Sequence, residues 1–152
     1  MGGNPYWYFV KYQDDLGDAL QQLRDREFRA GRYFPAIDAM FEFPFPPGPD
    51  SPAPGAQHLS IEEAIEAAAE SGTNSILDIE SIGDEPFFCV AAPVDPALLR
   101  QLVGTDQPTR AMLESPAANE LFESIERGQA LYVVLYKDGQ PDEIYFAGIS
   151  FD

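Results

Sequence analysis

Basic residues are scarce in this sequence. Nine lysines and arginines, of which only Lys11 and Lys137 are lysines, stand against 26 aspartates and glutamates, so the formal net charge is −17. Nucleic acids and anionic membranes carry dense negative charge and are repelled by such a surface, whereas cations and basic protein surfaces are attracted. The composition therefore predicts that neither nucleic acid nor membrane is a partner, and it favours a basic protein surface.

Cysteine and long apolar runs are also lacking. Cys89 is the single cysteine, so the chain forms no intramolecular disulfide and no cysteine-rich metal site, which suits a reducing cytoplasm. The segment 1–5 has neither a basic region nor a long apolar region, so we expect no signal peptide. No apolar run approaches the roughly 20 residues that span a bilayer. We therefore expect a soluble, cytoplasmic protein.

Catalytic motifs are missing as well. The sequence has no glycine-rich nucleotide-binding fingerprint, P-loop, zinc-protease helix, nucleophile elbow or EF-hand loop. His58, the only histidine, follows a proline-rich stretch where a rigid general base is hard to hold. Cys89 lies in an apolar run that reads as a strand, with no basic residue nearby in sequence, so we expect a buried, unreactive thiol. These features favour a non-enzymatic protein, and we assign no catalytic residue, metal or cofactor.

The chain nevertheless has the composition of a folded domain. Hydrophobic residues make up 45% of it, including eleven phenylalanines and seven tyrosines. Apolar periodicity, caps and turn residues predict the following elements. The first part of the chain is predicted to form a strand at 6–13, a helix from about 15 to 30 and a helix at 60–70. Two strands at 75–82 and 86–92, joined by a turn, come next. Helices at 95–104 and 116–128, with a helical turn after 108, precede the last two strands at 131–137 and 143–151. This β-α-loop-α-β-β-α-α-β-β order predicts a single α+β domain over 1–152, with a mainly antiparallel sheet of about five strands.

An irregular proline- and phenylalanine-rich excursion at 33–59 interrupts this order. Seven prolines lie between Pro35 and Pro54, interleaved with Phe41, Phe43 and Phe45. The three rings either close over the sheet as part of the core or stand exposed as a recognition surface. Core packing is favoured, because three free rings would promote aggregation. Exposed rings or an open edge strand would instead favour a dimer.

Charged residues supply three further candidates. Glu27 falls within the apolar stripe of the first helix, so its carboxylate points toward the core, either as a proton-transfer group or, as we favour, paired with an arginine or at a frayed helix end. The arginines of 24–32 could bind an anion, although helix geometry separates them and local neutralisation is favoured. Asp78 and Glu80 would share one face of a strand and could bind a partner or a hard cation, although a solvated face is the favoured interpretation.

Three functional hypotheses follow. The leading one is a small acidic binding protein that docks on a basic partner, as inhibitors and immunity proteins of nucleases do. The second is a small-molecule pocket between the sheet and the Phe-Pro segment, which is residues 40–47 of the excursion. Glu27 would be among the polar groups of this pocket. The third is that the acidity, of which −14 lies in residues 60–152, is an adaptation to salt with no bearing on a partner.

Overall fold

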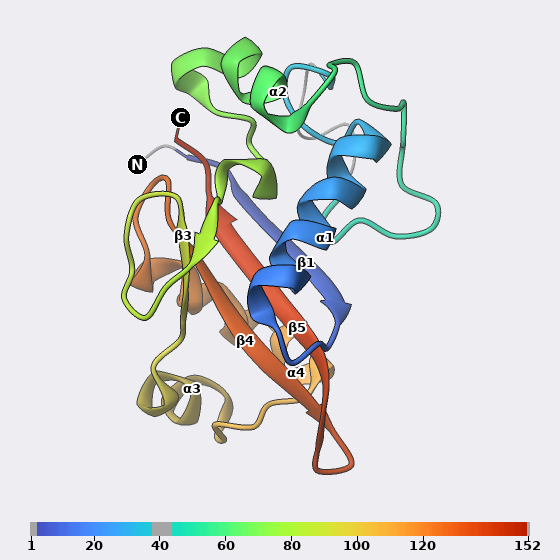
Figure 1. The fold of residues 1–152 in the computed structure, drawn as a ribbon. Coiled ribbons are helices and arrows are strands. Elements are labelled where there is room, and N and C mark those ends of the chain that lie inside the picture. Colours follow the sequence, from blue (N-terminus) through green and yellow to red (C-terminus); the bar gives the residue numbers. More distant parts are fainter. Residues whose placement is uncertain (1–2, 38–43, 152) are drawn as a thin grey trace.

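The computed structural model describes residues 3–37 and 44–151, and it confirms an α+β fold built on one mixed sheet (Figure 1). The strands are β1 (Pro5–Lys11), β2 (Ser81–Ile82), β3 (Val90–Pro93), β4 (Ala130–Lys137) and β5 (Gln140–Ile149). Their order across the sheet is β1-β5-β4-β3-β2. The long β1, β5 and β4 pair antiparallel, whereas the short β3 and β2 add parallel ladders.

The helices begin and end close to the predicted caps. They are α1 (Leu16–Ala30), α2 (Ile61–Ala68), α3 (Pro96–Val103) and α4 (Arg110–Leu113), with 3-10 segments η2 (Ala69–Ser71), η3 (Ile76–Asp78) and η4 (Pro116–Ser124). The Asp15 carboxylate accepts from the backbone N–H of Asp18 at the start of α1, and Gly31 ends that helix at φ 75°. Ser60 and Asp95 cap α2 and α3 in the same way.

Helices cover both faces of the sheet. Side chains alternate along β1, so Tyr6 and Tyr8 enter the core beneath α1 and η3, whereas Trp7 and Phe9 pack with the core formed by α3, α4 and η4. Figure 1 shows α1 in front of the sheet and α4 behind it. This confirms the prediction of a first strand that is covered on both faces.

The prediction of strands at 75–82 and 86–92 joined by a turn is only partly correct, because both strands are shorter and they pair parallel. Residues 76–78 form η3 instead of a strand, because the Ser75 hydroxyl accepts from the backbone N–H of Leu77 and the chain turns there. Within the predicted strand 75–82, only Ser81–Ile82 pairs as a strand, β2, before the chain leaves the sheet. It returns after a long loop and runs parallel to β2 (Figure 1). The predicted helix at 116–128 is likewise the 3-10 segment η4, which ends at Ser124.

Part of the Phe-Pro segment covers the outer edge of β1, the last strand on that side of the sheet. The Phe45 ring lies 5.5 Å from the Trp7 ring and 5.6 Å from the Tyr8 ring, measured between ring centroids. Because Trp7 and Tyr8 point to opposite faces, Phe45 must lie across the strand edge. Core packing is thus confirmed for Phe45, while Phe41 and Phe43 lie outside the described residues. Proline-rich chain at an edge also hinders pairing with another molecule's strand.

Replacing Phe45 by alanine is expected to lower the free energy of unfolding by about 2 kcal/mol, because a half-buried ring is removed from two aromatic contacts. Urea titration would measure the loss. Leu59→Ala is a matched control, since Leu59 is 90% exposed and its truncation is expected to change stability by no more than about 0.5 kcal/mol. Equal stabilities of the two variants would contradict the assignment of Phe45 to the core.

Candidate functional site

Glu27 lies fully buried on α1 and forms an ion-pair cluster. Arg32 Nε donates to Oε1 at 2.8 Å and Arg32 Nη2 donates to Oε2 at 2.7 Å, while Arg26 Nε donates to Oε2 at 2.9 Å. The bond to Glu27 raises the pKa of Arg32, and burial followed by the charge of Glu27 raises the pKa of Tyr8. The inward orientation and the favoured arginine pairing are both confirmed. Three charge-assisted bonds on one carboxylate fit a structural role better than proton transfer.

The four arginines around α1 do not converge on one site. Arg24 is buried and donates from Nη2 to the Leu77 carbonyl at 2.9 Å, and burial lowers its pKa. Arg26 and Arg32 bind Glu27, whereas Arg29 lies exposed. Local neutralisation is therefore confirmed for two of them, and the geometry does not assemble an anion site from all four.

Asp78 and Glu80 do not form the predicted pair on one strand face. Asp78 ends η3 and is buried, and its carboxylate accepts from the backbone N–H of Thr73 at 2.9 Å and from Thr73 Oγ1 at 2.8 Å. Burial raises the pKa of Asp78 despite these bonds. Glu80 is exposed. Within residues 3–37 and 44–151, no three His, Cys, Asp or Glu side chains gather into a metal-binding group.

Among the described residues, the most exposed aromatic side chains lie in the loop between β2 and β3. Phe87 is 69% exposed and Phe88 is 54% exposed. The base of the loop is fixed, because the Cys89 N–H donates to the Gly128 carbonyl at 2.8 Å and the Phe88 ring lies 4.8 Å from the Phe151 ring. Gly128 is required there: it has φ 80°, and a Cβ would come within 2.5 Å of the Phe88 ring.

The structure of this loop also differs from the prediction for Cys89. The residue adopts φ 64° in the turn before β3 and is half-buried, so it is not the mid-strand core residue that the sequence predicts. Burial raises the pKa of the thiol, and the charges of Glu80 and Asp78 raise it further. The raised pKa agrees in direction with the expected unreactive thiol.

A cavity of about 550 Å³ lies beside the Phe87 loop, and we call it the acidic groove. Its lining combines three carboxylates with an apolar surface and includes no lysine or arginine. The lining residues are Asp84, Glu85, Pro86, Ala92, Pro93, Val94, Asp95, Pro96, Leu98, Ser124, Ile125, Ala130 and Leu131. Arg127 is close in sequence but does not line the groove. The groove therefore matches a ligand that is both positively charged and partly apolar.

Comparison with protein-family models, curated proteins and solved structures finds no match to this chain.

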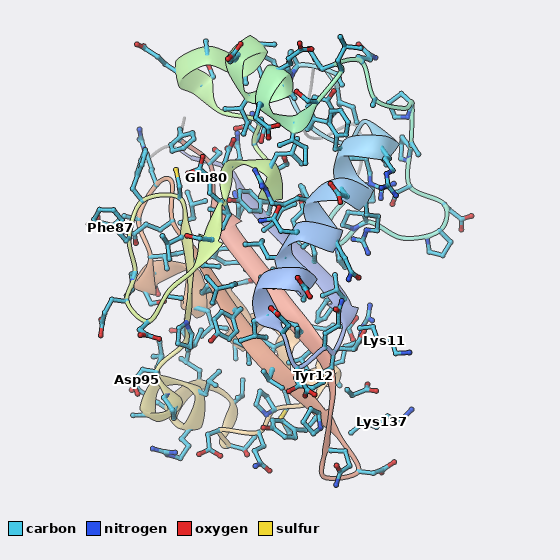
Figure 2. All side chains as sticks on the ribbon, in the orientation of Figure 1. Lys11, Tyr12, Glu80, Phe87, Asp95 and Lys137 are labelled. Carbon is cyan, nitrogen blue, oxygen red and sulfur yellow. The ribbon has the colours of Figure 1, made fainter. Side chains whose placement is uncertain are left out.

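Charge is unevenly distributed around the groove. The sequence has no lysine or arginine between Arg32 and Arg100, a stretch that contains twelve acids. Figure 2 shows Phe87 and Asp95 on one side of the molecule and the two lysines, Lys11 and Lys137, near the opposite side. Both lysines therefore lie away from the three carboxylates that line the groove.

The pocket hypothesis places Glu27 beside the Phe-Pro segment, of which residues 38–43 lie outside the described residues. Phe45, Trp7 and Phe122 help to line a hollow of about 260 Å³, and Glu27 is not among its lining residues. Both Glu27 oxygens are bound by arginines.

In the part of the chain that is described, no helix is long and apolar enough to cross a membrane.

Proposed function

We propose that this chain is a non-enzymatic protein-binding module that docks on a basic surface of another protein, in the manner of nuclease inhibitors and immunity proteins. The observation that supports the proposal is the excess of acidic residues: the sequence has twelve acids and no basic residue between Arg32 and Arg100, and both lysines lie away from the groove. Nucleic acids and anionic membranes would be repelled by this surface. The cytoplasm is the proposed location.

The physical advantage of such a surface lies in recognition. Long-range attraction raises the rate at which a basic partner arrives, and it orients the partner before contact. Carboxylates without a compensating base also penalise acidic competitors, so charge contributes specificity as well as speed. Neither effect needs a catalytic group, which agrees with Glu27 and Asp78 being committed to internal contacts.

Equilibrium binding at several salt concentrations tests the proposal. A partner would be captured on the immobilised chain at low NaCl, identified by mass spectrometry and purified. Its dissociation constant would then be measured by fluorescence anisotropy. We expect a basic partner whose affinity falls by about tenfold or more between low and physiological salt. A partner that is acidic, or an affinity independent of salt, would refute electrostatic docking.

Adaptation to salt is the alternative explanation of the acidity, and stability measurements distinguish it. If the carboxylates exist to hold a hydrated surface in concentrated salt, removing KCl should unfold the protein. If they exist for docking, the protein should stay folded in low-salt buffer. Thermal melting across a KCl series separates these outcomes without a partner.

A further inference from the structure

The loop at 83–89 presents an aromatic pair at a fixed position. Phe88 is held from behind by Phe151 and Gly128, and the Val90 N–H donates to the Phe87 carbonyl at 3.1 Å. Phe87 itself projects outward, at 69% exposure (Figure 2). A large ring on a braced loop loses little conformational freedom when it is covered, which is typical of residues that dominate binding energy.

The same loop contributes Asp84, Glu85 and Pro86 to the lining of the acidic groove, so Phe87 follows a lining residue directly in sequence without lining the groove itself. Asp84 and Glu85 are exposed, and neither takes part in an ion pair with any of the residues described. Asp95 lies on another wall, where its Oδ1 accepts from the Ala97 N–H. Val94, Leu98 and other apolar residues complete the lining.

We propose that Phe87 and the acidic groove together form the docking surface, and that the occupant is a basic segment of a partner protein. The segment carries a lysine or arginine next to an apolar side chain. The cationic head binds Asp84 and Glu85, and its aliphatic stem lies on the apolar lining, as long basic side chains commonly do. Phe87 packs on the neighbouring apolar residue. This inference rests on the proposed function and assigns it to one surface.

Labelled peptides of equal length test the inference by fluorescence anisotropy at low NaCl. The probes are a lysine–leucine peptide, an all-lysine peptide and a glutamate–leucine peptide. We expect the wild-type chain to bind the lysine–leucine peptide most tightly and the glutamate–leucine peptide least. Amide NMR shifts on titration should concentrate in residues 84–98 and 124–131, which contain the groove lining.

Two variants and two matched controls locate the site. Phe87→Ala, and Asp84→Asn combined with Glu85→Gln, should each weaken binding of the lysine–leucine peptide by about tenfold. Leu59→Ala removes another exposed apolar side chain elsewhere, and Asp138→Asn combined with Asp142→Asn removes two charges near Lys137. Both controls should stay within about twofold of wild type.

The outcomes separate the surface from the function. If the groove variants bind no more weakly than the controls while the wild type still binds the basic peptides in a salt-dependent way, the assigned surface is wrong and the proposed function stands. If the glutamate–leucine peptide binds as tightly as the lysine–leucine peptide, charge recognition in the groove is refuted. If neither lysine peptide binds the wild type at low salt, the surface and the proposed function both fail.

Discussion

Replacing Glu27 by alanine is expected to lower the free energy of unfolding by about 3–5 kcal/mol. The carboxylate is fully buried and balances Arg32, whose side chain is only 10% exposed. Without Glu27 the guanidinium keeps its charge, because the pKa of arginine lies far above neutrality, and it has to stay buried without its partner. The loss of stability therefore comes mainly from the buried Arg32 guanidinium that has no counter-charge. Urea unfolding monitored by circular dichroism would measure this loss.

Two comparisons test this explanation. Arg26→Ala removes the outer partner, which is 44% exposed, and should cost no more than about 1 kcal/mol because Arg32 still holds both carboxylate oxygens. Replacing Glu27 and Arg32 together by methionine should be less damaging than Glu27→Ala, since no unpaired charge remains. If Glu27→Ala and Arg26→Ala were equally stable, the buried pair would not be a main support of the fold.

The second large effect is expected from Asp78→Ala, a loss of about 2–4 kcal/mol. The Asp78 carboxylate closes the turn from Thr73 by accepting from its backbone N–H and from its hydroxyl. Alanine leaves the buried N–H of Thr73 without this acceptor, and an unsatisfied buried donor costs about 1–3 kcal/mol. Asp78→Asn keeps an acceptor oxygen and should lose only about 1 kcal/mol. Urea unfolding followed by Trp7 fluorescence compares them, and equal losses would contradict the hydrogen-bond explanation.

The difference in stability between wild type and Asp78→Asn should depend on pH, because Asp78 titrates. Burial raises the pKa of this carboxyl in the folded state above its ordinary value of 3.8. At a pH between 3.8 and the folded-state pKa, the folded protein binds more protons at Asp78 than the unfolded protein does. The free energy of unfolding therefore falls as the pH rises through this window. Asp78→Asn cannot titrate. The stability of wild type minus that of Asp78→Asn should therefore decrease from about pH 3.8 upward and level off above the folded-state pKa. A difference that increases over this window would contradict the assignment.

Local patterns predicted most of the fold. The cap at Asp15 and the left-handed Gly31 bound α1, and the 3.6-residue period predicts that Glu27 faces the core, where it lies. The hairpin of β4 and β5 followed from two alternating segments around a turn. These features depend on neighbours in sequence, which is why a single sequence contains them.

The segment 75–92 could not be predicted in the same way. Its apolar alternation is typical of a buried strand, yet Asp78 is drawn into a turn by Thr73, and Phe88 is held by Phe151 from the far end of the chain. The sequence pattern accordingly does not indicate Phe87 or the groove, and it predicts candidate binding residues at Asp78 and Glu80 instead. The Gly-Asp-Glu-Pro run at 83–86 was the available signal, because it marks a loop that carries exposed residues.

The association rate constant as a function of ionic strength tests the central claim most directly. Stopped-flow mixing of the labelled chain with its captured partner would give this constant over a series of NaCl concentrations. Docking of a −17 chain on a basic surface predicts a rate that falls by about tenfold or more as salt screens the attraction, with a much smaller change in the dissociation rate. An association rate that stays constant across the series would contradict the claim.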